Sequence, residues 1–397
     1  MGSTWKKKGG GHSLKQYEAW KRAVESENEI VASAVVAMNV PPRSSAEFVL
    51  ILGTNAINIG LARKLTEKSH ALRCRDPLKA LALARLASEV AAKAPAPAEF
   101  PFAGWDAEGF AWMRRASALL QLGRYQEALD AALNARYMFF MASPYTLRSS
   151  ATLDLIQGQI RHGLGETDAG LELIEHAANI IRDVFGETDK YVEAMTMYGG
   201  ILMRADRYDE AAQVWEDIAA LASGQGDTAT LAYMLNNFGL CNLHVRKIDE
   251  AKRCFSTALK MFQELGLNTE IPRVRGGFAL ALTQEGRYAQ AISEHYLNRA
   301  EFVRYGMLVD AGKAATRIIE TLFIAGRFDD IPRLCEETVQ FFKEAGLPHE
   351  ARKAAVYMED AARRGKLHID DVREVEAFIE RLRDSPTDSF VPPSDMY

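Results

Sequence analysis

The stretch Leu235–Leu259, "LNNFGLCNLHVRKIDEAKRCFSTAL", decides the fold of this chain of 397 residues. Gly239 lies within an apolar spacing that is otherwise helical, although glycine in a helix interior costs about 1 kcal/mol relative to alanine. Twelve residues later, Ala251 occupies a matching place in a second helical run. Small residues at both positions let two helix axes approach closely, and the packing gained offsets the cost of the glycine. The stretch therefore predicts a tightly packed helical hairpin.

The pattern recurs along the chain. Six phrases of the type "GRYQEA" follow one another at intervals of 40 to 42 residues. Their third residues are Tyr125, Thr167, Tyr208, Ile248, Tyr288 and Phe328. Five glycines spaced by 40 residues end apolar runs, where a helix C-terminus favours positive φ. These are Gly186, Gly226, Gly266, Gly306 and Gly346. The chain is therefore expected to repeat a structural unit of about 40 residues.

Each period predicts two helices of about 17 residues joined by a short loop, and a tandem series of such hairpins forms a solenoid. In the fourth period the helices are expected over 229–245 and 248–265. Asp227 suits an N-cap, while Pro272 and Pro348 suit a first helical turn. No alternation of period two marks a strand, so we expect an all-α fold.

Small residues twelve positions apart occur in five of the six repeats. The pairs are Ala116/Ala128, Gly158/Gly170, Gly199/Ala211, Gly239/Ala251 and Ala279/Ala291, whereas the sixth repeat has Ile319/Ile331. Two further features accompany these pairs. An aromatic residue often follows the first small residue by nine positions, and an aromatic or aliphatic residue often follows the second by four. The whole pattern resembles the tetratricopeptide repeat (TPR). The resemblance covers residues 105–345. The period of 40 exceeds the usual value of about 34 and is similar to bacterial arrays with longer helices.

The resemblance implies a right-handed superhelical solenoid of about seven TPR-like hairpins, preceded by an N-terminal helical extension. It also implies that the first helix of each hairpin lines a concave surface that binds a protein or peptide segment. The residues that this register places there are Met203, Arg204, Tyr233, Asn236, Asn237, Leu240, His244, Arg273, Lys313, Arg317 and Glu320.

Two features of this predicted surface suggest how it would bind. Asn237 stands where similar proteins hold a peptide backbone, since one amide both donates and accepts hydrogen bonds. Arg273, Lys313 and Arg317 would form a basic stripe suited to a carboxylate. The full carboxylate clamp of the family is absent, because Gly277 takes the place of the next asparagine. Solvation or pairing of these residues within the chain is the alternative.

The flanking sequence divides the chain further. We expect a flexible basic tail over 1–13, a helical region over 14–93, a linker over 94–104, the repeats over 105–345, a capping hairpin over 346–384 and a disordered tail over 385–397. Within these regions, helices are predicted over 14–38, 44–63, 76–93, 347–363 and 369–382. Ser44 and Glu47 suit a capping box. The charged surface of the last hairpin suits a polar cap.

Composition excludes several classes of function. The net charge of −5 gives no overall case for binding nucleic acid or a membrane surface. Four scattered cysteines without a CxxC pair fit reduced thiols, and no secretory signal is visible, so we expect a cytoplasmic protein. No helix-turn-helix is recognisable, which disfavours direct DNA reading.

The sequence carries no recognisable catalytic, cofactor or metal motif. There is no HExxH or GxSxG, and His162, His176, His244 and His295 lack short metal-ligand spacing. The segment 306–316, "GMLVDAGKAAT", has five residues between its glycines and no Ser or Thr after Lys313, so it is not a phosphate-binding loop. An α/α-toroid glycoside hydrolase of similar length is the alternative enzyme class.

We therefore predict a non-catalytic scaffold that binds a protein or peptide, as a regulatory adaptor or sensor in a bacterial signalling or defence system. Its partner would be an effector such as a protease or a DNA-binding regulator. For the N-terminal helices a plain cap is favoured, and a homodimer interface is the alternative.

Overall fold

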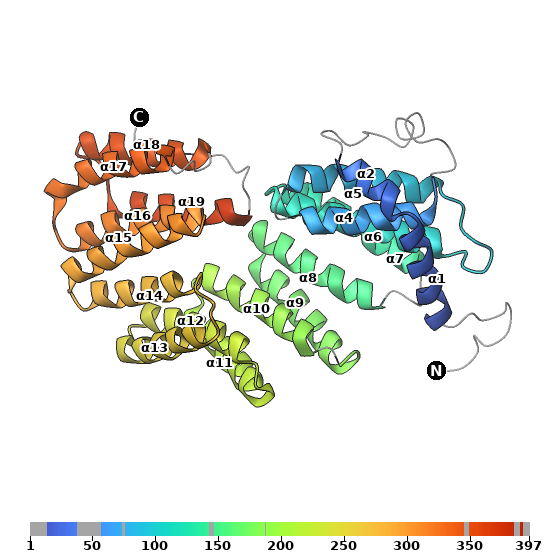
Figure 1. The fold of residues 1–397 in the computed structure, drawn as a ribbon, viewed down its shortest axis with the longest axis horizontal. Coiled ribbons are helices and arrows are strands. Elements are labelled where there is room, and N and C mark those ends of the chain that lie inside the picture. Colours follow the sequence, from blue (N-terminus) through green and yellow to red (C-terminus); the bar gives the residue numbers. More distant parts are fainter. Residues whose placement is uncertain are drawn as a thin grey trace. The chain divides into compact units, whose positions relative to one another are not determined.

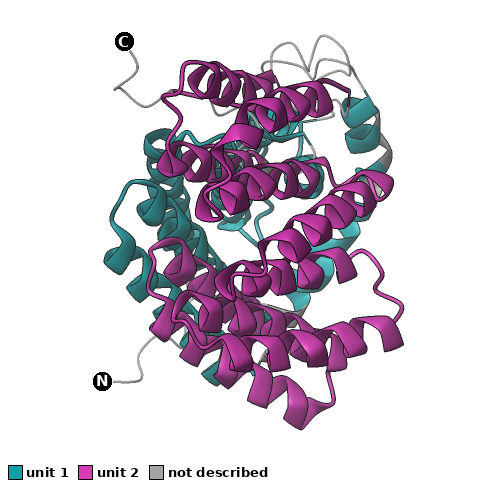
Figure 2. Ribbon diagram, turned by 90° about the vertical axis from the view of Figure 1, so that its left-hand side faces the viewer, with its two compact units in different colours: residues 1–190 teal, residues 191–397 magenta. Residues whose placement is uncertain are grey.

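The computed structural model describes residues 14–37, 57–73, 76–142, 147–186, 188–344, 349–384 and 390–391. These residues form helices and connecting turns without any strand, which confirms the all-α prediction (Figure 1). The chain divides into two compact units, Met1–Lys190 and Tyr191–Tyr397, which Figure 2 colours separately.

Unit 1 contains two N-terminal helices followed by a series of hairpins in which each helix packs against the next. Its helices are α1 (Leu14–Glu27), α2 (Glu29–Ala37), α4 (Ile59–Leu72), α5 (Pro77–Lys93), α6 (Ala103–Gln121), α7 (Tyr125–Ala142), α8 (Leu147–Gly163) and α9 (Thr167–Asp183).

Unit 2 continues the hairpins. Helix α10 (Thr188–Arg204) crosses the division between the units. The others are α11 (Tyr208–Gln225), α12 (Thr228–His244), α13 (Ile248–Glu264), α14 (Ile271–Gln284), α15 (Tyr288–Arg304), α16 (Leu308–Ile324), the 3-10 helix η2 (Phe328–Asp330), α17 (Ile331–Glu344), α18 (His349–Arg363) and α19 (Ile369–Asp384). The predicted hairpins of the repeats are thus present with nearly the predicted bounds.

The helix ends form as the sequence predicts. Gly226 ends α11 at φ 71°, a conformation that costs glycine nothing sterically. The next residue, Asp227, caps α12 by accepting a hydrogen bond from the Thr230 N–H at 3.0 Å. Pro272 stands in the first turn of α14. Gly346 and Pro348 lie outside the described residues.

The atoms nearest to the place of a Cβ at Gly239 belong to Phe255, a contact that the sequence pattern did not predict. A Cβ at Gly239 would lie 2.6 Å from the ring of Phe255, and a Cβ at Gly277 would approach the same ring equally closely. The fully buried Phe255 ring therefore fills the space that two successive first helices leave free. At Gly158 and Gly170 the small residues face one another directly, since a Cβ at Gly170 would lie 2.5 Å from the Gly158 oxygen.

Two predictions for the N-terminal region need correction. The helix expected over 14–38 is two helices, α1 and α2, separated at Asn28. Of the helix expected over 44–63, residues 44–56 lie outside the described part of the chain. Within that part, α4 begins at Ile59 and continues past the predicted end to Leu72, and the Asn58 side chain caps it by accepting from the Leu61 N–H at 2.9 Å. Ser44 and Glu47 lie outside the described residues.

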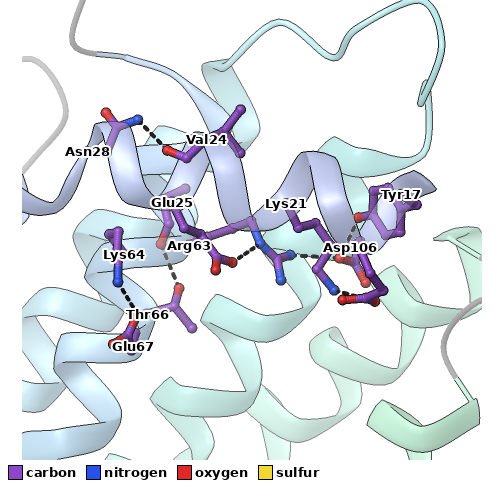
Figure 3. A network of polar contacts seen from close by, with 12 residues as sticks. Tyr17, Lys21, Val24, Glu25, Asn28, Arg63, Lys64, Thr66, Glu67 and Asp106 are labelled. Atoms are coloured by element: carbon purple, nitrogen blue, oxygen red, sulfur yellow. Dashed lines mark hydrogen bonds and ion pairs between the residues drawn. The ribbon is translucent and has the colours of Figure 1, made fainter. Parts of the chain in front are cut away.

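A buried polar network joins α1 and α4 to α6 (Figure 3). Asp106 accepts hydrogen bonds from the Tyr17 hydroxyl at 2.7 Å and from the Arg63 guanidinium at 2.8 Å. Arg63 also donates to Glu25 at 2.6 Å. Burial, with Asp106 adding to it, raises the pKa of Tyr17 far above its ordinary value, so the hydroxyl keeps its proton and donates. The predicted linker is packed here as well, because Phe100 is buried against Tyr17.

The C-terminal hairpin forms with bounds within two residues of the prediction. The prediction of a disordered tail does not hold for Phe390, whose ring packs against Tyr357 and Phe378. The Phe390 N–H also donates to Glu350 at 2.9 Å. Residues 385–389 and 392–397 lie outside the described part of the chain.

Candidate functional site

Helices α16 and α19 pack against each other (Figure 1). Three ion pairs join them in antiparallel order. Lys313 Nζ lies 2.8 Å from Glu380 Oε1, and Arg317 Nε lies 2.7 Å from Glu376 Oε1. The third pair reverses the charges, because Arg373 Nε donates to Glu320 Oε1 at 2.8 Å. We call the side of α16 that carries Lys313, Arg317 and Glu320 the α16 face.

The charges of the α16 face are compensated unequally. Burial acts to lower the pKa of Arg317, but the carboxylates of Glu376, Glu380 and Glu320 together outweigh it and raise that pKa. Burial and the neighbouring Arg317 lower the pKa of Lys313 in spite of Glu380. Positive charge on this face is therefore held in place by the carboxylates of α19.

The opposite side of α19 is apolar. Val372, Val375, Phe378 and Ile379 are buried in a core that also contains Ile318 and Leu322 of α16. The charged side of this helix is shared between α16 and solvent, because Arg373 and Glu380 pair with α16 and are still more than half exposed, so the polar cap stays a prediction. An amphipathic helix with acidic residues is the kind of occupant that the α16 face accepts.

Arg273, the third member of the predicted basic stripe, is also paired within the chain. Its guanidinium lies 3.0 Å from Glu270 and 3.4 Å from Asp310. Burial acts to lower the pKa of Arg273, and the two carboxylates together raise it. The structure thus favours intramolecular pairing, the alternative reading, for all three basic residues.

The predicted residues of α12 form no ion pair within the described part of the chain and remain partly accessible. Tyr233 is 38% exposed, and its ring packs edge-on against Phe262 at 5.0 Å. Asn237 and Leu240 are half-buried, and His244 is exposed with its ring stacked on Tyr208 at 3.8 Å. We call the side of α12 that carries Tyr233, Asn237, Leu240 and His244 the α12 face.

The remaining predicted positions differ in exposure. Asn236 is half-buried, and its side-chain oxygen is buried without a hydrogen-bond partner among the described residues. In α10, Met203 is half-buried and Arg204 is exposed. The structure thus places the predicted residues of α12 close together on one helix. The predicted residues of α16 are instead occupied by ion pairs with α19.

The described residues contain no group of three or more His, Cys, Asp or Glu placed to hold a metal ion. Every carboxyl group among them with a shifted pKa has it lowered, by hydrogen bonds and charges from basic side chains, by hydroxyl side chains or by backbone N–H groups. A general acid for glycoside hydrolysis needs a shift in the opposite direction. None of the helices described is long and apolar enough to cross a membrane.

No protein-family model matches the chain, and no curated protein matches it by sequence. Among solved structures, it is similar to aspartyl phosphate phosphatase F from Bacillus subtilis, with 12% sequence identity and a TM-score of 0.51 over 97% of this chain and 99% of the other. A Rap protein complexed with competence and sporulation factor has 12% identity and a TM-score of 0.44, covering 79% and 99%. A signal transduction ATPase with a tetratricopeptide repeat sensor from Pyrococcus horikoshii has 12% identity and a TM-score of 0.46, covering 96% and 68%. The fold class is that of TPR-like helical repeat proteins.

Sequence reasoning missed the role of α19, although a signal for it exists. Lys313, Arg317 and Glu320 are spaced at i, i+4 and i+7, and one side of α19 carries Arg373, Glu376 and Glu380 at i, i+3 and i+7. The two series are complementary in charge when read in opposite directions. That complementarity predicts antiparallel pairing of the two helices.

Proposed function

We propose that this protein is a non-catalytic scaffold that binds a helical segment of a partner protein on the α12 face, as a regulatory adaptor in a bacterial signalling system. The contact between α16 and α19 is the observation that carries the proposal. It shows that a first helix of this repeat accepts an amphipathic helix by combining charge pairs with apolar packing.

The α12 face carries side chains that remain partly accessible. Tyr233 offers a large apolar area, while its hydroxyl interacts with Glu270 within the chain. Asn237 offers an amide that can donate and accept hydrogen bonds. Peptide recognition commonly uses such aromatic anchors beside a few polar groups. The fold class supports a protein or peptide partner but does not identify it.

Site-specific photocrosslinking tests the proposal. A photoreactive phenylalanine analogue replaces Tyr233 in one variant and Leu297, which is 54% exposed on α15, in a control variant. We expect a discrete crosslinked partner from position 233 in cells of the native host, and none from position 297. Equal crosslinking from both positions, or from position 297 alone, would exclude the α12 face as the binding site.

A pair of substitutions tests the residues themselves. Tyr233→Ala combined with Asn237→Ala should weaken capture of the crosslinked partner by at least about ten-fold, which corresponds to about 1.4 kcal/mol. Arg253→Ala, at a residue with a 69% exposed side chain on α13, serves as the control and should leave capture unchanged. Unchanged capture by the folded double variant would contradict the proposal.

A further inference from the structure

Two ends of one helix interface in unit 1 differ in how their charges are compensated. Helices α4 and α6 are the first helices of consecutive hairpins and pack against each other. At one end, Arg63 lies 2.8 Å from Asp106 and 2.6 Å from Glu25, so its charge is neutralised by carboxylates. This contact fixes the register of α4 against α6 (Figure 3).

The other end of the interface gathers positive charge. Because α4 and α6 are separated by one antiparallel helix, they run in the same direction, and two turns beyond the Arg63–Asp106 contact the register brings His70 beside Arg114. Arg73 follows at the C-terminus of α4, where its Nη1 donates to the His70 carbonyl oxygen at 3.1 Å and lies 3.4 Å from the His70 ring nitrogens.

Arg114 has no anionic partner among the described residues. Its Nε is buried and makes no hydrogen bond there. Burial and the charge of Arg73 lower the pKa of Arg114 to about 10, and no carboxylate counters them. Burial and the two arginines lower the pKa of His70 to about 4, which leaves its imidazole neutral near pH 7. Arg114 as a whole is half-buried, and a partly buried guanidinium without a counter-ion is a position that an anion from outside would stabilise.

The repeat register shows which anion suits this position. Arg114 stands two residues before the small residue Ala116, and Arg317 stands two residues before Ile319 at the same place of the sixth repeat. Arg317 is neutralised by the Glu376 carboxylate of a helix that packs along it. The same position of two repeats thus carries an arginine, and only in the sixth does the described chain supply its carboxylate.

We propose that Arg114, Arg73 and His70 form a binding site for a carboxylate side chain of a partner polypeptide. Two guanidinium groups supply charge and paired donors, and the neutral His70 ring adds one further hydrogen-bonding group. The site belongs to unit 1 alone and does not depend on the function proposed for the α12 face.

Calorimetric titration of the full chain tests the site. The probes are a terminally blocked tri-glutamate peptide, the matching tri-glutamine peptide and inorganic phosphate, all at one ionic strength. The variants are Arg114→Met and, as the matched control, Arg333→Met, whose side chain is 70% exposed on α17. We expect tri-glutamate to bind the wild type and Arg333→Met equally, and Arg114→Met at least about ten-fold more weakly, whereas tri-glutamine should not bind.

Three results would overturn the proposal. The first is equal tri-glutamate affinity of Arg114→Met and Arg333→Met, and the second is equal binding of tri-glutamine by the wild type. The third is tighter binding of phosphate than of tri-glutamate with the same dependence on Arg114, which would reassign the site to phosphate groups. Should circular dichroism show that Arg114→Met does not fold, Arg73→Met provides the test, and unchanged tri-glutamate affinity there would contradict the site.

Discussion

At the scale of single residues, the close approach of helices depends on missing Cβ atoms, and α10 offers an adjacent pair that tests this. A Cβ at Gly199 would lie 2.6 Å from the buried Trp215 ring, whereas a Cβ at Gly200 meets only the end of Arg204 at 3.8 Å. Gly199→Ala should therefore lower the free energy of unfolding by about 1–3 kcal/mol through overpacking. Gly200→Ala should raise it by up to about 1 kcal/mol, because alanine favours the helix. Urea denaturation measures both, and destabilisation of equal size would contradict the packing account.

A second residue-scale prediction concerns acid stability. Burial, with Arg317 adding to it, lowers the pKa of His295 to about 3, and its Nε2 has no hydrogen-bond partner among the described residues. The unfolded chain has a histidine pKa of about 6.5, so it binds the proton first as pH falls. The titration of His295 therefore leaves the free energy of unfolding unchanged above about pH 6.5. Between about pH 6.5 and pH 3 it lowers that free energy as pH falls, by up to about 1.4 kcal/mol per pH unit.

His295→Leu should remove that part of the pH dependence. Stability curves between pH 7 and pH 4 should be flatter for His295→Leu than for the wild type, while His176→Gln, at an exposed position on α9, should leave the wild-type slope unchanged. Parallel curves for wild type and His295→Leu would show that His295 does not titrate in this way.

At the scale of elements, the ion pair between α16 and α19 should couple the two helices. Arg317→Glu places two carboxylates together and should destabilise unit 2 by about 1–3 kcal/mol, because the Glu376 side chain is only 14% exposed. Adding Glu376→Arg should recover part of the loss, and a double-mutant cycle measures the coupling. The exposed pair Arg333–Glu337 serves as the control and should couple by less than about 1 kcal/mol. Equal coupling energies in both cycles would contradict a specific contact between α16 and α19.

The same scale shows what the sequence could and could not predict. The hairpins were predictable because their signals, such as Gly226 with Asp227, act over a few residues. The pairing of Arg317 with Glu376 joins residues 59 apart, and no local propensity specifies it. The α12 residues remain a prediction as a binding site, because a register derived from a resemblance gives positions but not the partner.

At the scale of the whole molecule, a repeat chain transmits a perturbation mainly to neighbouring helices, since each hairpin contacts only those beside it. Asp106→Asn leaves Arg63 without one of its two carboxylates in a buried site (Figure 3) and should lower local stability by about 3 kcal/mol. Hydrogen exchange followed by mass spectrometry should then show faster exchange in α1, α4 and α6, and unchanged exchange in α14 to α19. Leu78→Ala, a truncation of an exposed side chain on α5, is the control and should alter neither set. Faster exchange throughout both units would instead mean that the chain opens as a single cooperative body, and the division between residues 190 and 191 would then have no energetic meaning.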